Sequence, residues 1–131
     1  MPKLHTTAAE LVDAARARIA EVETADQIAA VSDPNTVIVD IRDIRERKKG
    51  FIPGSVHAPR GMLEFWVDPE SPYYRDVFGQ DGKRYVLHCA SGWRSALATV
   101  ALNDMGFDAA HLRLGFSDWV KAGGPVETPD D

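Results

Sequence analysis

Cysteine is almost absent from this chain: Cys89 is the only one among 131 residues. A single cysteine cannot form an internal disulfide, so the sequence predicts a reducing compartment, which we take to be the cytoplasm. The histidines are few and scattered, without the spacing of metal ligands: His5, His57, His88 and His111. We therefore expect no metal site.

Long apolar runs and a positive net charge are lacking as well. No stretch approaches the ~20 apolar residues that a membrane-spanning helix needs. Glu10 and Asp13 interrupt the N-terminal segment, where a secretory signal would need an apolar core. The net charge of −5 disfavours non-specific binding of nucleic acid or of an anionic membrane. The remaining composition, 44% hydrophobic, suits one ordinary domain with its own core.

Strand patterns and helix patterns alternate along the chain. Short apolar runs predict strands at 36–40, 55–58, 84–88 and 109–112. Helical patterns lie at 7–20, 25–31, 42–49, 95–105 and 115–121. Thr6 or Thr7 is expected to cap the first helix, and Thr24 to open the second with a capping box. The stretch 59–82 has little periodicity and predicts a long loop or short helices. This alternation is typical of a mainly parallel sheet with helices on both faces.

The single thiol lies at the point where such folds place their chemistry. Cys89 follows the strand at 84–88 and precedes the helix at 95–105. Gly92 allows a tight loop whose N–H groups point inward, and such a nest at a helix N-terminus favours an anion. We therefore expect a thiolate at Cys89 and an oxyanion contact at Arg94, whose guanidinium offers forked donors. The alternative, a buried cysteine that acts only as a small hydrophobic side chain, explains neither Gly92 nor Arg94.

Four segments together resemble the single-domain rhodanese family of sulfurtransferases. They are Val39–Arg42 with Glu46, Gly50–Gly61, Cys89–Ser95, and Gly115–Trp119 with Gly124–Pro125. The resemblance extends over about residues 24–125, which makes it far more specific than one short motif. Two positions depart from the family pattern: Phe51 stands where histidine is common, and Leu114 where a glycine often precedes Gly115.

The resemblance implies a fold and an activity. The fold is a three-layer rhodanese-like one, with about five strands in a mainly parallel sheet flanked by helices. An N-terminal helical extension (1–23) would precede the domain (24–126), and a flexible acidic tail (127–131) would follow it. Cys89 would take a sulfane sulfur from thiosulfate or a similar anionic donor as a persulfide, without any cofactor. The acceptor would be cyanide, a thiol or a sulfur-relay protein, and neither nucleic acid nor a membrane is expected as a partner. The sequence leaves the oligomeric state open.

The expected roles of the other site residues follow from their positions. The substrate-binding set is Ala90, Ser91, Gly92, Trp93, Arg94 and Ser95, with Arg60 as a further anion contact or, alternatively, part of a surface salt bridge. The expected structural set is Asp40, Arg42 and Glu46. Arg42 and Glu46 are four residues apart and are expected to pair, and Asp40 is expected either to accept hydrogen bonds from the Cys89 loop or to cap a turn. Strand alternation points His88 away from Cys89, as a structural histidine.

Two other functions compete with sulfur transfer. Phosphatases and arsenate reductases also place a cysteine in an anion-binding loop that ends in arginine. Their loop has five residues between the cysteine and the arginine, whereas four, 90–93, separate Cys89 from Arg94. A rhodanese-like domain can also serve as a binding or sulfur-relay module without turnover, but such domains have usually lost the cysteine that this chain keeps.

Overall fold

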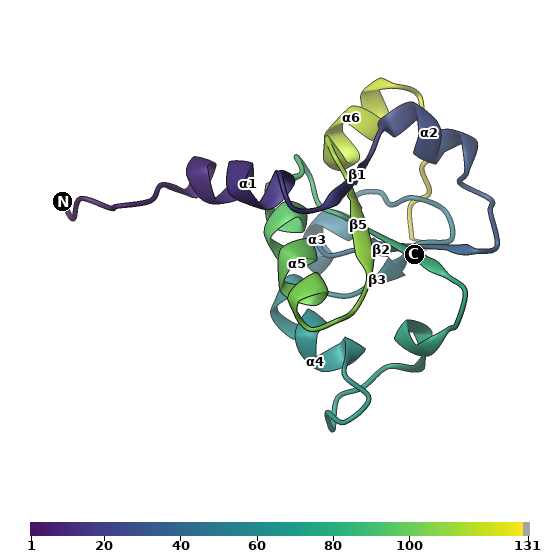
Figure 1. Cartoon of the computed structure of the whole chain (residues 1–131). Coiled ribbons are helices and arrows are strands. Elements are labelled where there is room, and N and C mark those ends of the chain that lie inside the picture. The colour runs from purple at the N-terminus through teal and green to yellow at the C-terminus, as the bar shows by residue number, and fades with distance from the viewer. Residues whose placement is uncertain (130–131) are drawn as a thin grey trace.

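Five parallel strands form the centre of the computed structural model, which describes residues 1–129 (Figure 1). Their order across the sheet is β1-β5-β4-β2-β3, and every neighbouring pair is parallel. The strands are β1 (Ala20–Val22), β2 (Thr36–Asp40), β3 (Val56–His57), β4 (Arg84–His88) and β5 (Ala109–Leu112). The predicted parallel α/β architecture is confirmed, and β2, β4 and β5 have the predicted bounds.

Helices connect the strands and cover both faces of the sheet (Figure 1). They are α1 (Ala8–Arg16), α2 (Thr24–Ala29), α3 (Ile44–Arg47), α4 (Leu63–Val67), α5 (Trp93–Asp104) and α6 (Gly115–Lys121). The aperiodic stretch 59–82 contains α4 and two short 3₁₀ turns, η1 (Arg60–Met62) and η2 (Asp76–Gly79). No helix among residues 1–129 is both long enough and apolar enough to cross a membrane.

Side-chain alternation along the strands divides the core into two layers. Val39 and Leu87 pack with α4 and α5 on one face of the sheet, and Cys89 belongs to this cluster. Val86 belongs to the cluster on the other face, which faces α2 and α6 and contains the fully buried Trp119. The thiol therefore lies on the α5 face.

The N-terminal segment departs from the prediction. The helix expected at 7–20 ends at Arg16, and Ala20–Val22 forms strand β1, which pairs with β5. The segment that the sequence assigned to an extension thus supplies an edge strand of the sheet, because the free edge of β5 offers hydrogen bonds that a longer α1 would leave unused. A capping box of Thr7 with Glu10 opens α1.

The capping box predicted at Thr24 is wrong. The residue that precedes α2 is Glu23, and its side chain makes no capping hydrogen bond. Thr24 is the first helical residue, and its hydroxyl donates instead to Asp118 Oδ2 on α6 at 2.5 Å. A tertiary partner has therefore replaced the local one that the sequence pattern suggested.

Phe51, a departure from the family pattern, is built into the fold. The guanidinium of Arg47 lies over its ring, 4.3 Å from the centroid. Its backbone forms an antiparallel bridge with Glu127, at the start of the predicted acidic tail. The last two residues of that tail, 130–131, lie outside the described residues.

Candidate active site

The sulfur of Cys89 is enclosed by the turn that joins β4 to α5. The N–H groups of Gly92 and Ser95 point at Sγ, at 3.2 and 3.4 Å. The thiol itself faces Ser95 Oγ at 3.5 Å. Cys89 is fully buried, with 0% of its surface exposed. The predicted nest is therefore present, and Gly92 and Ser95 supply these two hydrogen bonds.

Gly92 is required by the backbone at this point. It precedes α5 with φ +93°, a left-handed conformation that side chains rarely adopt. A Cβ atom at this position would overlap the carbonyl oxygen of Arg113, at the end of β5. The loop can therefore wind tightly around the sulfur only with glycine here.

The start of α6 holds the other side of the loop. The N–H groups of Phe116 and Ser117 donate to the carbonyl oxygens of Cys89 and Ala90, at 2.8 and 3.0 Å. Gly115 adopts φ +71°, and a Cβ there would lie 2.6 Å from the carbonyl carbon and oxygen of Ala90. With these carbonyls bound to α6, the loop's N–H groups are left to face the sulfur.

These contacts set the acidity of the thiol. Burial alone raises the pKa of Cys89 because it penalises the charged form. Hydrogen bonds from the Ser95 hydroxyl and from the backbone N–H groups of Ser95, Gly92 and Ser91 act in the opposite direction. The hydrogen bonds outweigh burial, so the pKa lies below that of an ordinary thiol and the thiolate is favoured.

Arg94 lies beside the thiol, with a partner that the sequence did not predict. Its two terminal nitrogens donate to the two carboxylate oxygens of Glu46, both at 2.9 Å, and each side chain is 37% exposed. The hydrogen bonds to Glu46 raise the pKa of Arg94; burial opposes this, and the nearby Cys89 adds to the rise. Arg94 is thus a permanent cation, held in orientation by a two-point ion pair.

The predicted pair of Arg42 with Glu46 is wrong. Arg42 precedes α3, so the four-residue spacing of a helix does not apply to it, and Asp43 caps that helix. The Arg42 side chain turns inward and donates to both oxygens of Asp40, at 2.9 and 2.8 Å. This leaves Glu46 free to reach Arg94.

Asp40 is the centre of a buried charge cluster. Its carboxylate also accepts a hydrogen bond from Arg47 at 3.2 Å, and His88 Nε2 lies 3.9 Å away. Burial raises the pKa of Asp40, but Arg42 and His88 lower it to about 2. Among the hydrogen bonds of residues 1–129, those to this carboxylate come from Arg42 and Arg47 rather than from the Cys89 loop. Of the two expected roles, the turn cap is confirmed, because the backbone N–H of Arg42 donates to Asp40 Oδ1 at 3.1 Å.

His88 faces away from the thiol, as strand alternation predicts. Its ring stacks on Phe116, with centroids 6.0 Å apart, on the α6 face of the sheet. Burial is the main reason why its pKa falls to about 4. His88 is therefore a neutral structural histidine at neutral pH.

The other predicted contacts lie at the surface. Trp93 is the first residue of α5 and is 47% exposed, and Ser91 is exposed beside it. Arg60 is exposed in η1, where its backbone N–H donates to Ile41. The side chains of Trp93 and Arg60 are therefore open to solvent.

The sequence missed three residues that are linked to the loop. Ser95 Oγ lies 2.8 Å from His111 Nδ1 on β5, and His111 Nε2 lies 2.9 Å from Glu21 Oε2 on β1. Arg16 at the end of α1 donates to the same Glu21 oxygen at 2.9 Å. The sequence pattern that could have identified His111 is the side-chain alternation in β5, which places His111 on the same face of the sheet as Ala109 and Cys89. Glu21 had no such signal, because its strand was not recognised.

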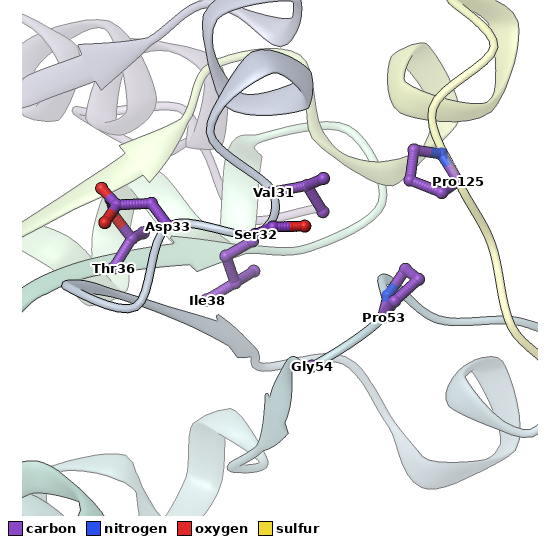
Figure 2. A pocket seen from close by; sticks show the side chains of 8 residues that line it. All are labelled: Val31, Ser32, Asp33, Thr36, Ile38, Pro53, Gly54 and Pro125. Atoms are coloured by element: carbon purple, nitrogen blue, oxygen red, sulfur yellow. Dashed lines mark hydrogen bonds between the residues drawn. The ribbon is translucent and has the colours of Figure 1, made fainter.

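A separate hollow of about 480 Å³ opens beside the start of β2 (Figure 2). It is lined by Val31, Ser32, Asp33, Thr36, Ile38, Pro53, Gly54 and Pro125. The Asp33 carboxylate is engaged locally, because it accepts from the Asn35 N–H and the Thr36 hydroxyl at 2.9 and 3.1 Å. The carboxylate in this hollow is thus already engaged, and no cysteine lines the hollow, so the candidate site remains at Cys89.

Fold and site together define a class: an α/β protein with a buried thiol in an N–H-lined turn between a parallel strand and a helix. Residues 23–122 match the model of the family described as rhodanese-like domain. The chain belongs to this family, as the four sequence segments predicted.

Three proteins that are similar to this chain have different descriptions. The thiosulfate:glutathione sulfurtransferase of Saccharomyces cerevisiae is 31% identical over 109 residues, covering 78% of this chain and 77% of the yeast protein. The tRNA uridine(34) hydroxylase of Mesorhizobium japonicum is 28% identical over 120 residues, covering 88% of this chain but 37% of the hydroxylase. The chain thus spans little more than a third of that enzyme.

The third is a solved structure from Rhodopseudomonas palustris, of a protein of unknown function described as a possible tyrosine phosphatase. It is 46% identical, superimposes with a TM-score of 0.91, and covers 97% of this chain and 99% of its own. At the level of the family, the comparisons support a sulfur-transfer enzyme.

Proposed function

We propose that the protein is a sulfurtransferase that carries a sulfane sulfur on Cys89. One observation carries the proposal: the N–H groups of Gly92 and Ser95 converge on Sγ at the start of α5. Such donors stabilise a thiolate before the reaction, and a persulfide is likewise an anion. This chemistry requires no metal ion or organic cofactor.

The reaction proceeds in two transfers. The Cys89 thiolate attacks the outer sulfur of thiosulfate, a new S–S bond forms, and sulfite leaves with the electron pair of the bond that breaks. The persulfide anion then remains on Cys89. In the second transfer a thiol or cyanide attacks the terminal sulfur, and the Cys89 thiolate is restored. A thiol acceptor agrees with the name of the yeast relative and with the reducing, cytoplasmic setting that the single cysteine predicts.

Arg94 is the proposed contact for the donor's sulfonate oxygens. A guanidinium has five N–H donors, and the Glu46 carboxylate occupies two of its nitrogens. The N–H groups that remain suit an oxyanion, and the ion pair fixes their direction. Trp93 and Arg60, both exposed, are candidates for the donor's approach path.

A phosphatase is the second candidate, because the related protein from Rhodopseudomonas palustris is described as a possible tyrosine phosphatase. The loop size argues against it here. Four residues separate Cys89 from Arg94, whereas the phosphate-binding loops considered above have five. A shorter loop has fewer N–H groups to surround a phosphoryl group, so it suits a single sulfur atom better.

Intact-protein mass spectrometry tests the proposal directly. After thiosulfate treatment we expect the mass to rise by one sulfur atom, and cyanide should remove the gain and yield thiocyanate. Cys89→Ser should show no gain while it keeps the wild-type unfolding curve. Full thiocyanate production by Cys89→Ser would refute the mechanism.

The same preparation separates the alternatives. Hydrolysis of an aryl phosphate that depends on Cys89, without any sulfur gain, would establish the phosphatase. If persulfide donors other than thiosulfate load Cys89 but cyanide and thiols do not unload it, the protein is a relay module that needs a protein acceptor.

A further inference from the structure

A chain of buried hydrogen bonds leads from the sulfur of Cys89 to the N-terminal segment. Ser95 Oγ lies 3.5 Å from Sγ and 2.8 Å from His111 Nδ1. On the other side of the imidazole ring, Nε2 lies 2.9 Å from Glu21 Oε2. Cys89, Ser95 and His111 are all fully buried, so water does not compete with the two contacts of Ser95 Oγ, and the contact of His111 with Glu21 is partly buried.

The donors and acceptors fix the direction of the chain. The Glu21 carboxylate, which also pairs with Arg16 at 2.9 Å, can only accept. His111 Nε2 therefore carries a proton, and in the neutral ring Nδ1 must then accept. The Ser95 hydroxyl donates to Nδ1, and its oxygen remains free to accept the thiol proton.

We propose that His111 receives the proton of the Cys89 thiol through Ser95. The S–H bond breaks and its proton passes to Ser95 Oγ, while the hydroxyl proton passes to His111 Nδ1. The products are a thiolate, an intact Ser95 hydroxyl that now donates to it, and an imidazolium beside the Glu21 carboxylate. No electron is gained or lost. The inference deepens the proposed function, since it names the group that prepares its nucleophile.

The groups around His111 keep the ring neutral before the transfer. The charged groups that act on the ring are Glu21 from β1 and Arg16 from α1, whereas α5 contributes the uncharged Ser95, through which the ring is linked to Cys89. Burial lowers the pKa of His111; Glu21 raises it and Arg16 lowers it, with a net lowering. The ring is therefore neutral before it accepts the proton, and Glu21 stabilises the imidazolium afterwards.

This inference gives the N-terminal segment a function. Arg16 and Glu21 lie within the region that the sequence set apart as an extension. Glu21, which is paired with Arg16, contacts His111 on the side of the ring opposite Ser95. His111 is thus a positioning residue for the thiolate, because it acts on the sulfur through Ser95.

His111→Asn tests the proposal, because asparagine can offer an acceptor near the Nδ1 position but cannot take up a proton. Since Cys89 is the only cysteine, the ultraviolet absorbance of the thiolate reports its titration once the Cys89→Ser signal is subtracted. We expect the midpoint to move to higher pH. We also expect sulfur loading from thiosulfate to slow about tenfold near pH 6 and to recover near pH 9, since each unit of pKa changes the thiolate fraction tenfold below the midpoint.

Matched variants keep the test decisive. Glu21→Gln should move the midpoint of the thiolate titration in the same direction. Glu23→Gln should leave the midpoint unchanged, because it removes a more exposed carboxylate, two residues away, that pairs with Arg113. If His111→Asn does not fold, Glu21→Gln carries the test, because it leaves the hydrogen bonds to the sulfur intact.

An unchanged midpoint in the folded His111→Asn variant, or in Glu21→Gln if His111→Asn does not fold, would overturn the inference. A loss of loading by an equal factor at every pH would also overturn it, because that result indicates a structural role alone. The titration is independent of sulfur transfer. If thiosulfate fails to load a wild-type protein whose thiolate titrates as expected, the proposed donor is wrong while the role of His111 stands.

Discussion

Gly115→Ala tests whether α6 holds the Cys89 loop in place. Two effects add at this position. An alanine at φ +71° meets the left-handed strain, which costs about 1–2 kcal/mol. Its Cβ would also lie 2.6 Å from the carbonyl of Ala90 and 2.8 Å from the carbonyl oxygen of Cys89, so the backbone must move. Such overpacking typically costs about 1–3 kcal/mol.

Gly123→Ala is the matched control. Gly123 also has a positive φ, +81°, but among residues 1–129 no atom beyond those of its chain neighbours lies within 4 Å of the position of its Cβ. This variant should therefore lose only the strain, about 1–2 kcal/mol. The difference between the two variants isolates the contact between α6 and the loop, and we expect about 1–3 kcal/mol for it.

Urea unfolding of both variants measures the difference, provided that the slope m stays unchanged. Sulfur loading of Cys89 supplies a second readout. We expect Gly115→Ala to load slowly, because the hydrogen bonds that Phe116 and Ser117 donate to the Cys89 and Ala90 carbonyls lengthen when the backbone shifts. Equal stability and equal loading rates in the two variants would refute the idea that α6 shapes the loop.

Two further predictions concern charges. Arg94→Ala should raise the KM for thiosulfate about tenfold, since charge-assisted contacts with an oxyanion are strong. It should lower the free energy of unfolding by at most about 1 kcal/mol, because the ion pair of Arg94 with Glu46 is partly exposed. Equal KM values in the variant and the wild type would show that Arg94 does not bind the donor. For His88, the folded pKa of about 4 lies below the unfolded 6.5, so the unfolded chain binds the proton first and stability should fall by about 3 kcal/mol from pH 7 to about pH 4. Asp40, with a pKa of about 2, affects stability only at lower pH. Urea unfolding should show the fall, with a smaller one in His88→Asn, and equal stability at both pH values would contradict the burial argument.

The sequence predicted the central strands because their signal is local. Strands β2, β4 and β5 are short apolar runs, and each has the predicted bounds. The edge strand β1 has three residues, Ala20, Glu21 and Val22, which is too short for a pattern, and its existence depends on pairing with β5 at a separation of 90 residues. Sequence periodicity carries no information about such a partner.

In the candidate site too, the sequence predicted the features that depend on neighbouring residues but not the contacts between residues far apart in the chain. The environment of the Cys89 thiol followed from the glycine and the strand-to-helix turn, which lie within a few residues of it. The partners of Glu46 and His111 could not be predicted from nearby residues, because Arg94 is 48 residues from Glu46 and Glu21 is 90 residues from His111. Arg42 pairs with the buried Asp40 rather than with Glu46, because leaving a buried carboxylate without a partner costs more free energy than leaving an exposed one without a partner.

The position of β1 at the edge of the sheet has a consequence for how the chain folds as it is made. β1 is synthesised first, yet its neighbour in the sheet is β5, the last strand. Synthesis proceeds from the N-terminus, so β1 stays without a partner until Leu112 has left the ribosome. The hydrogen bond between Glu21 and His111 waits for the same event. A nascent chain therefore completes the surroundings of its only thiol at the end of folding, when the sheet closes.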